Sequence, residues 1–287
     1  MKTRELLLAL LVPLTWALGF TVAKAALDEF PPLLLMSMRF FIAGLILVWF
    51  VPIPRHCLKD LFWISLVGST LQYGLTFTGL SMIDASLGGI VVQLEVPFSV
   101  LLAVIFFRER PGLLRIIGMT ISFLGIALIA GRPSLSGHLE GILLTASGAL
   151  VWAVGQIMYK RISSQIDGLT GIAWIGVIAA PQMLIGSMIF ETGQVDALMN
   201  ASWVGWTSVV YLGLIMTVVG YGIWFTVLAR NPVSHIMPVL LVLPVFTVLF
   251  SVLLLGEKPS LEILLGGVTI LAGVSLIVFS KSNTRPT

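Results

Sequence analysis

The sequence is built from long apolar runs of about 20 residues that are separated by short polar breaks. A helix that crosses the ~30 Å hydrocarbon core of a membrane needs roughly 20 mostly apolar residues. The pattern therefore predicts an all-α integral membrane protein with ten transmembrane helices. We expect these helices to span about residues 5–27, 32–51, 58–80, 85–107, 112–131, 138–159, 168–190, 203–229, 233–255 and 260–280.

Two other classes of fold are excluded. A soluble domain carries about 25% charged residues, whereas this chain has 10% charged and 58% hydrophobic residues and a mean hydropathy of +1.07. A membrane β-barrel would show alternating segments of about ten residues, but the run 249–255 is apolar almost throughout. The basic N-terminus precedes an apolar stretch that continues to Leu27 without a cleavage site, so we expect an uncleaved first helix.

The loop charges predict the orientation. If the N-terminus is cytoplasmic, twelve Lys and Arg residues fall on the cytoplasmic side and three on the other, with Arg39 inside a span. Bacterial inner-membrane proteins show this bias in short loops, so both termini are expected in the cytoplasm. The basic residues are scattered singly and form no stripe that could follow a nucleic acid. The cytoplasmic set is Lys2, Arg4, Arg55, Lys59, Arg108, Arg110, Arg115, Lys160, Arg161, Arg230, Lys281 and Arg285, against Lys24, Arg132 and Lys258.

The chain matches itself at offsets of 136 and 148 residues. We therefore expect two homologous halves, 1–133 and 134–287, each with five spans. Because five is odd, the second half enters the membrane in the opposite sense, as in carriers that alternate access around a midplane site. The matching elements are Trp16-Ala17 with Trp152-Ala153 at the first offset, and Tyr73-Gly74 with Tyr221-Gly222 and Glu109-Arg110-Pro111 with Glu257-Lys258-Pro259 at the second.

These elements carry a family resemblance. The Trp-Ala-x-Gly element of each half, the Leu-x-x-Pro segments at Pro97 and Pro244, and the Glu-[Arg/Lys]-Pro turns resemble the EamA-type family of the drug/metabolite transporter superfamily. The resemblance covers about residues 5–280 and, within the family, is greatest to YddG-type amino-acid exporters. It implies a secondary transporter that exports amino acids, including aromatic and apolar ones, and related metabolites.

Glu95 is the sharpest candidate for a functional residue. It lies about ten residues from either end of the fourth predicted span, on one helical face with Gly88, Val92 and Ser99. Ionisable groups inside a bilayer are costly, so this face should look inward. Glu95 then either binds a substrate ammonium or exchanges a proton, or it is a neutral, hydrogen-bonded carboxyl that joins two helices.

Polar and aromatic residues of the third and eighth spans are further candidates. Gln72, Tyr73 and Thr76 share one region of the third span, where they form either a binding wall or a close helix contact. Tyr221 and Trp224 are the counterparts of Tyr73 and Thr76 in the second half.

The first and sixth spans add aromatic candidates. Trp152, Gln156 and Tyr159 lie on one face of the sixth span. An indole N–H and a carboxamide both need partners in lipid, so this face should meet protein or water. Trp16 occupies the position equivalent to Trp152, and we expect the two rings to form aromatic walls of a binding site.

Three residues are candidates for structural or gating roles. Arg39 lies about seven residues into the second span, deep enough to need a carboxylate, a carbonyl or a path to the interface. The alternatives for Arg39 are a structural ion pair and a contact with a lipid phosphate. Pro97 and Pro244 interrupt backbone hydrogen bonds, and so either supply bends for gating or kink packed helices.

Several chemistries find no support in the sequence. It has no Walker A loop, no H-E-x-x-H or G-x-S-x-G motif and no paired metal ligands. We expect no enzyme activity, no cofactor and no metal, and as partners a small-molecule substrate and membrane lipid. Export of cationic drugs or nucleotide-sugars and an enzyme acting on lipid headgroups are the alternatives. The sequence specifies neither proton coupling nor oligomeric state, and it is compatible with a monomer.

Overall fold

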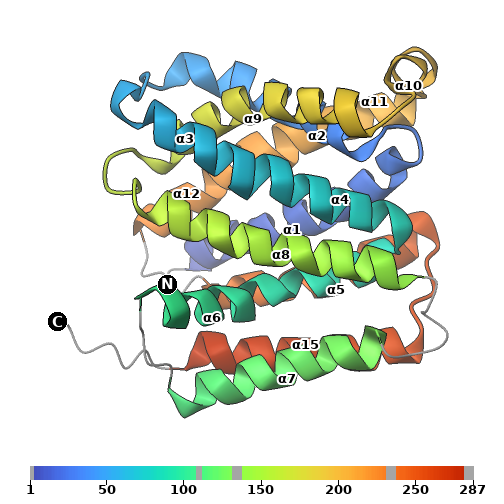
Figure 1. Ribbon diagram of the computed structural model, residues 1–287. Helices are drawn as coiled ribbons and strands as arrows, with labels where there is room; N and C mark the ends of the chain where they lie inside the picture. The colour runs from blue at the N-terminus through green and yellow to red at the C-terminus, as the bar shows by residue number, and fades with distance from the viewer. Residues whose placement is uncertain (1–2, 108–111, 131–137, 231–236, 281–287) are drawn as a thin grey trace.

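The computed structural model describes residues 3–107, 112–130, 138–230 and 237–280, and every regular element in these ranges is helical. The helices lie side by side, with α1, α8, α5 and α6 in the middle of the bundle and the pair α7 and α15 at one side (Figure 1). Thr3 at the start of α1 and Phe279 at the end of α15 lie at the same end of the bundle.

The helices follow the predicted spans closely. In the first half they are α1 (Thr3–Leu27), α2 (Pro32–Leu47), α3 (Leu58–Ser65), α4 (Gln72–Met82), α5 (Ala85–Val91), α6 (Glu95–Phe107) and α7 (Leu113–Ala130). In the second half they are α8 (Leu139–Lys160), α9 (Gly168–Phe190), α10 (Gln194–Asn200), α11 (Trp203–Val210), α12 (Gly220–Arg230), α14 (Leu243–Phe250) and α15 (Leu261–Phe279).

Many of these helices are long enough to span a membrane. Within the described ranges, seven helical stretches are long and apolar enough to cross a membrane, and two shorter apolar helices, Leu113–Ile129 and Val239–Leu255, accompany them. The predicted span 58–80 is a continuous helical stretch from Leu58 to Met82 that contains α3 and α4. The start of the predicted span 233–255 and the Glu109-Arg110-Pro111 turn lie outside the described residues.

Four helical stretches change their winding partway along. A π-helical segment, Leu66–Leu71, leads into α4, and a second, Tyr211–Val219, leads into α12. Short 3₁₀ segments, Val92–Leu94 and Met237–Val242, precede α6 and α14. At membrane depth such irregular backbone is tolerated where it is buried in protein or faces water, and π segments are frequent at functional sites.

Glycines bring several helices into close contact. A Cβ atom built on Gly44 of α2 would lie 2.6 Å from the backbone nitrogen of Val177 in α9. A Cβ built on Gly118 of α7 would lie 2.6 Å from the carbonyl oxygen of Gly273 in α15. Without a strong hydrophobic force between helices in lipid, such close backbone packing supplies much of the association, so a larger residue at Gly44 or Gly118 would separate these pairs.

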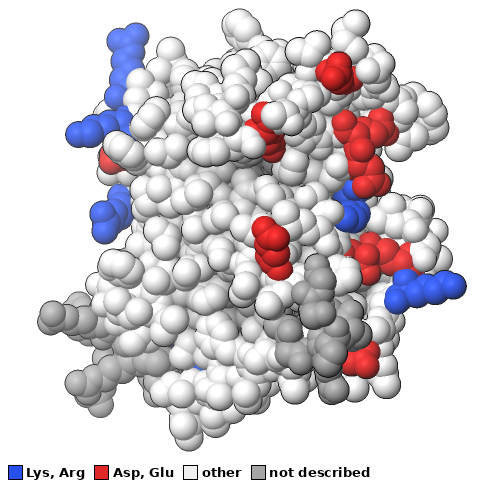
Figure 2. Space-filling view, turned by 45° about the vertical axis from the view of Figure 1, so that its right-hand side comes forward, with Lys and Arg blue, Asp and Glu red and all other residues white. Residues whose placement is uncertain are grey.

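Glutamates cap helix N-termini at the end of the bundle where α1 ends, which we call the acidic end. Ala85 and Ser86 of α5 donate backbone hydrogen bonds to Glu257 (2.6 and 3.0 Å). Glu191 accepts from two backbone N–H groups of the first turn of α2, at 2.7 and 3.2 Å, and Glu29 accepts from the backbone N–H of Ser202, before α11. Figure 2 shows the acidic side chains gathered toward this end. A carboxylate at a helix N-terminus satisfies unpaired N–H groups and complements the helix dipole.

Two further charges belong to the acidic end. The Lys24 ammonium donates to the carbonyl oxygens of Leu80 and Ser81 (3.1 and 3.0 Å), at the C-terminus of α4. Burial, and then the negative charge of Glu257, raise the pKa of Asp84, which precedes α5. Each of the three glutamate caps joins residues 1–133 to residues 134–287. The Lys24 contact lies within residues 1–133.

Candidate functional site

Glu95 begins α6, directly after the 3₁₀ segment Val92–Leu94. The residue is only partly buried, so part of its surface remains accessible. Among the described residues, no group donates a hydrogen bond to its carboxyl, whereas its backbone carbonyl oxygen accepts from the Ser99 hydroxyl at 2.7 Å. The Ser99 hydroxyl is therefore held by its own helix, while the Glu95 carboxyl can accept an outside donor.

Tyr73 lies in an aromatic group that also holds Arg39. Its ring packs edge-on against Phe40 at 5.0 Å and stacks on Phe77 at 5.6 Å. The Arg39 guanidinium lies over the same ring, 4.9 Å from its centroid. The site is therefore lined by aromatic faces on the side of α2 and α4.

Tyr221 brings the two halves of the chain together. Its hydroxyl approaches that of Tyr73, its counterpart at the offset of 148, and both Arg39 and Glu95 lie within electrostatic range of it. Its ring lies 4.9 Å from the ring of Trp16. Trp16, Tyr73 and Tyr221, from three different spans, thus form one group, and Glu95 lies within electrostatic range of it.

Trp224 extends this group toward α14. Its ring lies 6.1 Å from Trp16, and the side chain is buried with Val12 of α1 and Val239. The Trp16 Nε1 is buried without a hydrogen-bond partner. A buried indole N–H without an acceptor is costly, so this atom is an open donor beside Tyr221.

Trp152 does not mirror Trp16. Both side chains are partly buried, but Trp152 makes no aromatic ring contact within the described ranges. The cause lies in the partner positions: a Cβ on Gly220 would lie 2.7 Å from the Trp16 Nε1, so Trp16 occupies space that only glycine leaves free. The counterpart of Gly220 at the offset of 148 is Gln72, so the equivalent position carries a side chain.

Gln72 and Thr76 lie in the contact between α4 and α8. The Gln72 amide donates to the Thr76 hydroxyl at 3.0 Å, and both side chains are buried. Thr76 packs against Gly148 of α8, where a Cβ would collide with its hydroxyl. The Gln72 Oε1 is buried without a donor, so this pair joins two helices and leaves one acceptor open.

Gln156 and Tyr159 lie away from Glu95. Gln156 is exposed, and Tyr159 packs over Gly171 of α9 in a cluster that contains Cys57 and Leu61. This cluster lies at the end of the bundle opposite the acidic end. The sequence grouped Gln156 and Tyr159 with Trp152 because helical periodicity shows which residues share a face, but not how far along the helix a site lies. Pro97 is buried in the first turn of α6, and Pro244 is buried at the start of α14.

Arg39 has none of the ionic partners that the sequence suggests. It is 1% exposed, which rules out a lipid phosphate, and no carboxylate pairs with it among the described residues. Its Nε donates to the Thr217 hydroxyl at 2.9 Å. Thr217 and Phe40 are therefore members of the group that the sequence did not indicate. Their residue types are ordinary for membrane helices, and only the three-dimensional contacts single them out.

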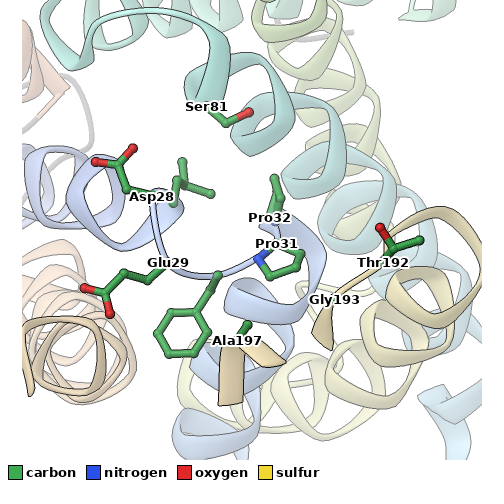
Figure 3. Close-up of a pocket in the computed structure, with 10 residues that line it drawn as sticks. Asp28, Glu29, Pro31, Pro32, Ser81, Thr192, Gly193 and Ala197 are labelled. Atoms are coloured by element: carbon green, nitrogen blue, oxygen red, sulfur yellow. The ribbon is translucent and has the colours of Figure 1, made fainter. Parts of the chain in front are cut away.

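A separate pocket of about 370 Å³ lies at the acidic end. The turn from Asp28 to Pro32 forms one wall, and Ser81 faces that turn from the end of α4 (Figure 3). The pocket lining includes Glu29, one of the glutamate caps, but not Glu95. Within the described ranges no group of His, Cys, Asp and Glu side chains could hold a metal ion.

Comparisons with known proteins agree on one family. The model of the EamA-like transporter family matches residues 3–131 and again residues 139–279. The chain is 30% identical over 288 residues to a "Probable amino-acid metabolite efflux pump" of Escherichia coli, covering 97% of this chain and 96% of that protein, and equally similar to the protein of the same name in Salmonella typhimurium.

More distant relatives fit the same pattern. The "Uncharacterized transporter YvbV" of Bacillus subtilis is 28% identical, over 96% of this chain and 92% of its own length. A solved crystal structure aligns over 96% of both chains with a TM-score of 0.63 at 19% identity, which shows a shared fold alone. With a family model that covers nearly all of both halves and relatives that match along their whole length, this multi-pass membrane protein belongs to the EamA-like transporter family.

Proposed function

We propose that the protein exports amino acids, including aromatic and apolar ones, and related small metabolites across the bacterial inner membrane by alternating access. It does so with ten transmembrane helices arranged as two inverted halves, 1–133 and 134–287, with both termini in the cytoplasm. The substrate site lies between the halves, around Glu95, Tyr73 and Tyr221.

The duplicated architecture has support from the backbone. The two matches to the family model follow one another along the chain. The π segments Leu66–Leu71 and Tyr211–Val219 overlap at the offset of 148, and so do the 3₁₀ segments before α6 and α14. The short helix α10 lies where the offset changes from 136 to 148 and supplies the extra length.

The substrate class rests on one observation above all: Glu95 is only partly buried, and its carboxyl has no hydrogen-bond donor among the described groups. A carboxylate at membrane depth is costly unless a cation or a proton accompanies it. The aromatic rings of Trp16, Tyr73 and Tyr221 beside it suit an apolar or aromatic side chain. Export of amino-acid metabolites is also the activity named for the Escherichia coli relative.

The test is counterflow of radiolabelled L-phenylalanine in proteoliposomes, followed by competition with the other amino acids. We expect wild-type protein to exchange the label and Glu95→Gln to lower the rate at least ~10-fold, because a charged hydrogen-bonding partner is lost. Glu140→Gln is the matched control, since Glu140 is an exposed carboxylate in the first turn of α8.

Two further arms separate the alternatives. A pH gradient that drives uptake in wild type but not in Glu95→Gln shows proton coupling, whereas flux that ignores the gradient shows facilitated exchange. Ethidium and a nucleotide-sugar are tested beside the amino acids. Exchange of either of these without exchange of any amino acid would overturn the proposed substrate class.

A further inference from the structure

Arg39 is a buried cation without an anion. It is the largest of the fully buried side chains, with 1% of its surface exposed, and it lies on α2 within a membrane-spanning stretch. No described carboxylate forms an ion pair with it. Removing a charge from water costs several kcal/mol even after the protein relaxes, so a permanent lack of a counter-ion needs a physical explanation.

The contacts that Arg39 does make leave its outer edge open. The Nε donates to Thr217 at 2.9 Å, and Thr217 in turn donates to the carbonyl oxygen of Leu212 at 2.8 Å, inside the π segment of the eighth span. The Nη1 has only the weak acceptor Met36 Sδ at 3.8 Å. The faces of Phe40 and Tyr73 lie 5.4 and 4.9 Å away.

These contacts fix the orientation of the guanidinium without neutralising it. A guanidinium carries five N–H donors, and among the described residues no oxygen accepts from its two terminal nitrogens. The edge formed by these nitrogens matches the two oxygens of a carboxylate. Tyr73, whose ring lies against the guanidinium at 4.9 Å, is itself only partly buried.

Glu95 carries the charge opposite to that of Arg39. The Arg39 guanidinium lies 4.9 Å from the ring centroid of Tyr73, and both Arg39 and Glu95 lie within electrostatic range of the Tyr221 hydroxyl. An α-amino acid carries its own anion and cation on one carbon. We propose that Arg39 binds the carboxylate of the transported amino acid while Glu95 holds its ammonium group, so that Arg39 is the residue that selects amino acids over simple amines; this inference rests on the proposed function.

The two halves differ in a way that suits a single zwitterion. At the offset of 148, the counterpart of Glu95 is Leu243, so the duplication supplies one acidic group and not two. An amine without a carboxylate would satisfy Glu95 but leave Arg39 unpaired. A carboxylic acid without an amino group would pair with Arg39 but leave Glu95 without a cation.

The experiment compares analogues that differ in one charge. In wild-type proteoliposomes, exchange of labelled L-phenylalanine is competed with L-phenylalanine, L-phenylalaninamide, which lacks the carboxylate, and 3-phenylpropionate, which lacks the ammonium. We expect both analogues to compete at least ~10-fold less well, since each leaves one buried charge unpaired. If another amino acid is the better substrate, it and its amide are used in the same way.

Variants assign the preference to Arg39. In Arg39→Gln, the KM for L-phenylalanine should rise at least ~10-fold. Competition by L-phenylalaninamide should change less than threefold. The variant should therefore no longer prefer the amino acid over its amide. Arg39→Lys should keep part of the preference, because it retains the charge but not the planar fork. The matched control is Arg115→Gln, since Arg115 also donates through Nε, to Ser280 at 3.0 Å, but on α7.

The outcomes are distinguishable. An amide that competes as well as the amino acid in wild type, or a preference that survives Arg39→Gln, overturns the role of Arg39 while leaving amino-acid export intact. Wild-type protein that exchanges no amino acid overturns the proposed function and this role with it. If Arg39→Gln fails to elute as a folded protein in detergent, the wild-type competition and Arg39→Lys decide the question.

Discussion

The two ends of the helix bundle are held together by different chemistry. At the acidic end, three carboxylates accept backbone hydrogen bonds from helices of the opposite half, for example Glu257 from Ala85 at 2.6 Å. At the opposite end, two links between the halves are neutral: the Trp174 indole donates to the carbonyl oxygen of Pro52 at 3.0 Å, and Cys57 lies 3.5 Å from Gln165. The Arg115 guanidinium also donates to the Ser280 hydroxyl at 3.0 Å, but this bond joins only the outer pair α7 and α15.

The difference indicates which end opens at the greater cost. Hydrogen bonds to a charged group contribute about 1.5–3 kcal/mol, against about 0.5–1.5 kcal/mol for neutral ones. Three charged caps at one end therefore favour conformations in which that end stays closed. A carrier that alternates between its two ends must offset this bias when it opens the acidic end, and binding of a charged substrate is one source of free energy for doing so.

The largest effect is expected from removing a cap. Glu257→Ala frees the first turn of α5, so Ser86, which is buried beneath the cap, should become accessible. With Ser86→Cys as the reporter in a Cys57→Ala background, labelling by a membrane-impermeant maleimide should rise about tenfold or more, because 1.4 kcal/mol is a factor of ten.

Glu140→Ala controls for the loss of a carboxylate at the same end, since Glu140 is exposed in the first turn of α8. It should leave the labelling of Ser86→Cys unchanged. Equal labelling rates in Glu257→Ala and Glu140→Ala would show that the cap does not hold the acidic end closed.

A smaller effect is expected at the opposite end. Trp174→Phe keeps an aromatic ring but removes the hydrogen bond to Pro52. Because this bond is neutral, maleimide labelling of the native Cys57, which is fully buried, should rise by no more than about threefold. A rise as large as that in Glu257→Ala would remove the contrast between the two ends.

The smallest effect, a change in Tm, is expected from replacing Asp84. Burial, and then repulsion by Glu257, raise the pKa of Asp84, so its stabilising contribution is complete below the ordinary value of 3.8 and is lost as pH rises through the higher pKa of the folded state. Asp84→Asn should therefore raise the Tm in detergent by about 1–2 °C at neutral pH and leave it unchanged near pH ~3. Asp196→Asn, at an exposed position of α10, is the control; an equal gain in both variants would contradict this role of Asp84.

Hydropathy predicted the helices well because lipid imposes length and apolarity on each one. The predicted span 168–190 coincides with α9, and 85–107 covers α5 and α6. The depth predicted for Glu95 rests on the same reasoning, since position within a span sets position within the membrane, and it stays a prediction. The family assignment from the paired Trp-Ala-x-Gly and Glu-x-Pro elements was confirmed.

The arrangement around Glu95 was harder to predict, because it depends on contacts between spans. The repeat suggested that Trp16 and Trp152 are equivalent, yet Trp16 packs against Gly220, and the position equivalent to Gly220 is Gln72. The π segments leave no mark in hydropathy, and neither does the pairing of Arg39 with Thr217. Such features arise where packing overrides local pattern.

The most direct measurement follows both ends of the bundle in proteoliposomes. Maleimide labelling of Ser86→Cys in the Cys57→Ala background reports on the acidic end, and native Cys57 reports on the opposite end. Adding L-phenylalanine should change the two labelling rates in opposite directions, because a carrier that opens one end closes the other. Rates that move in the same direction, or that stay constant while the amino acid is exchanged, would contradict alternating access between these two ends.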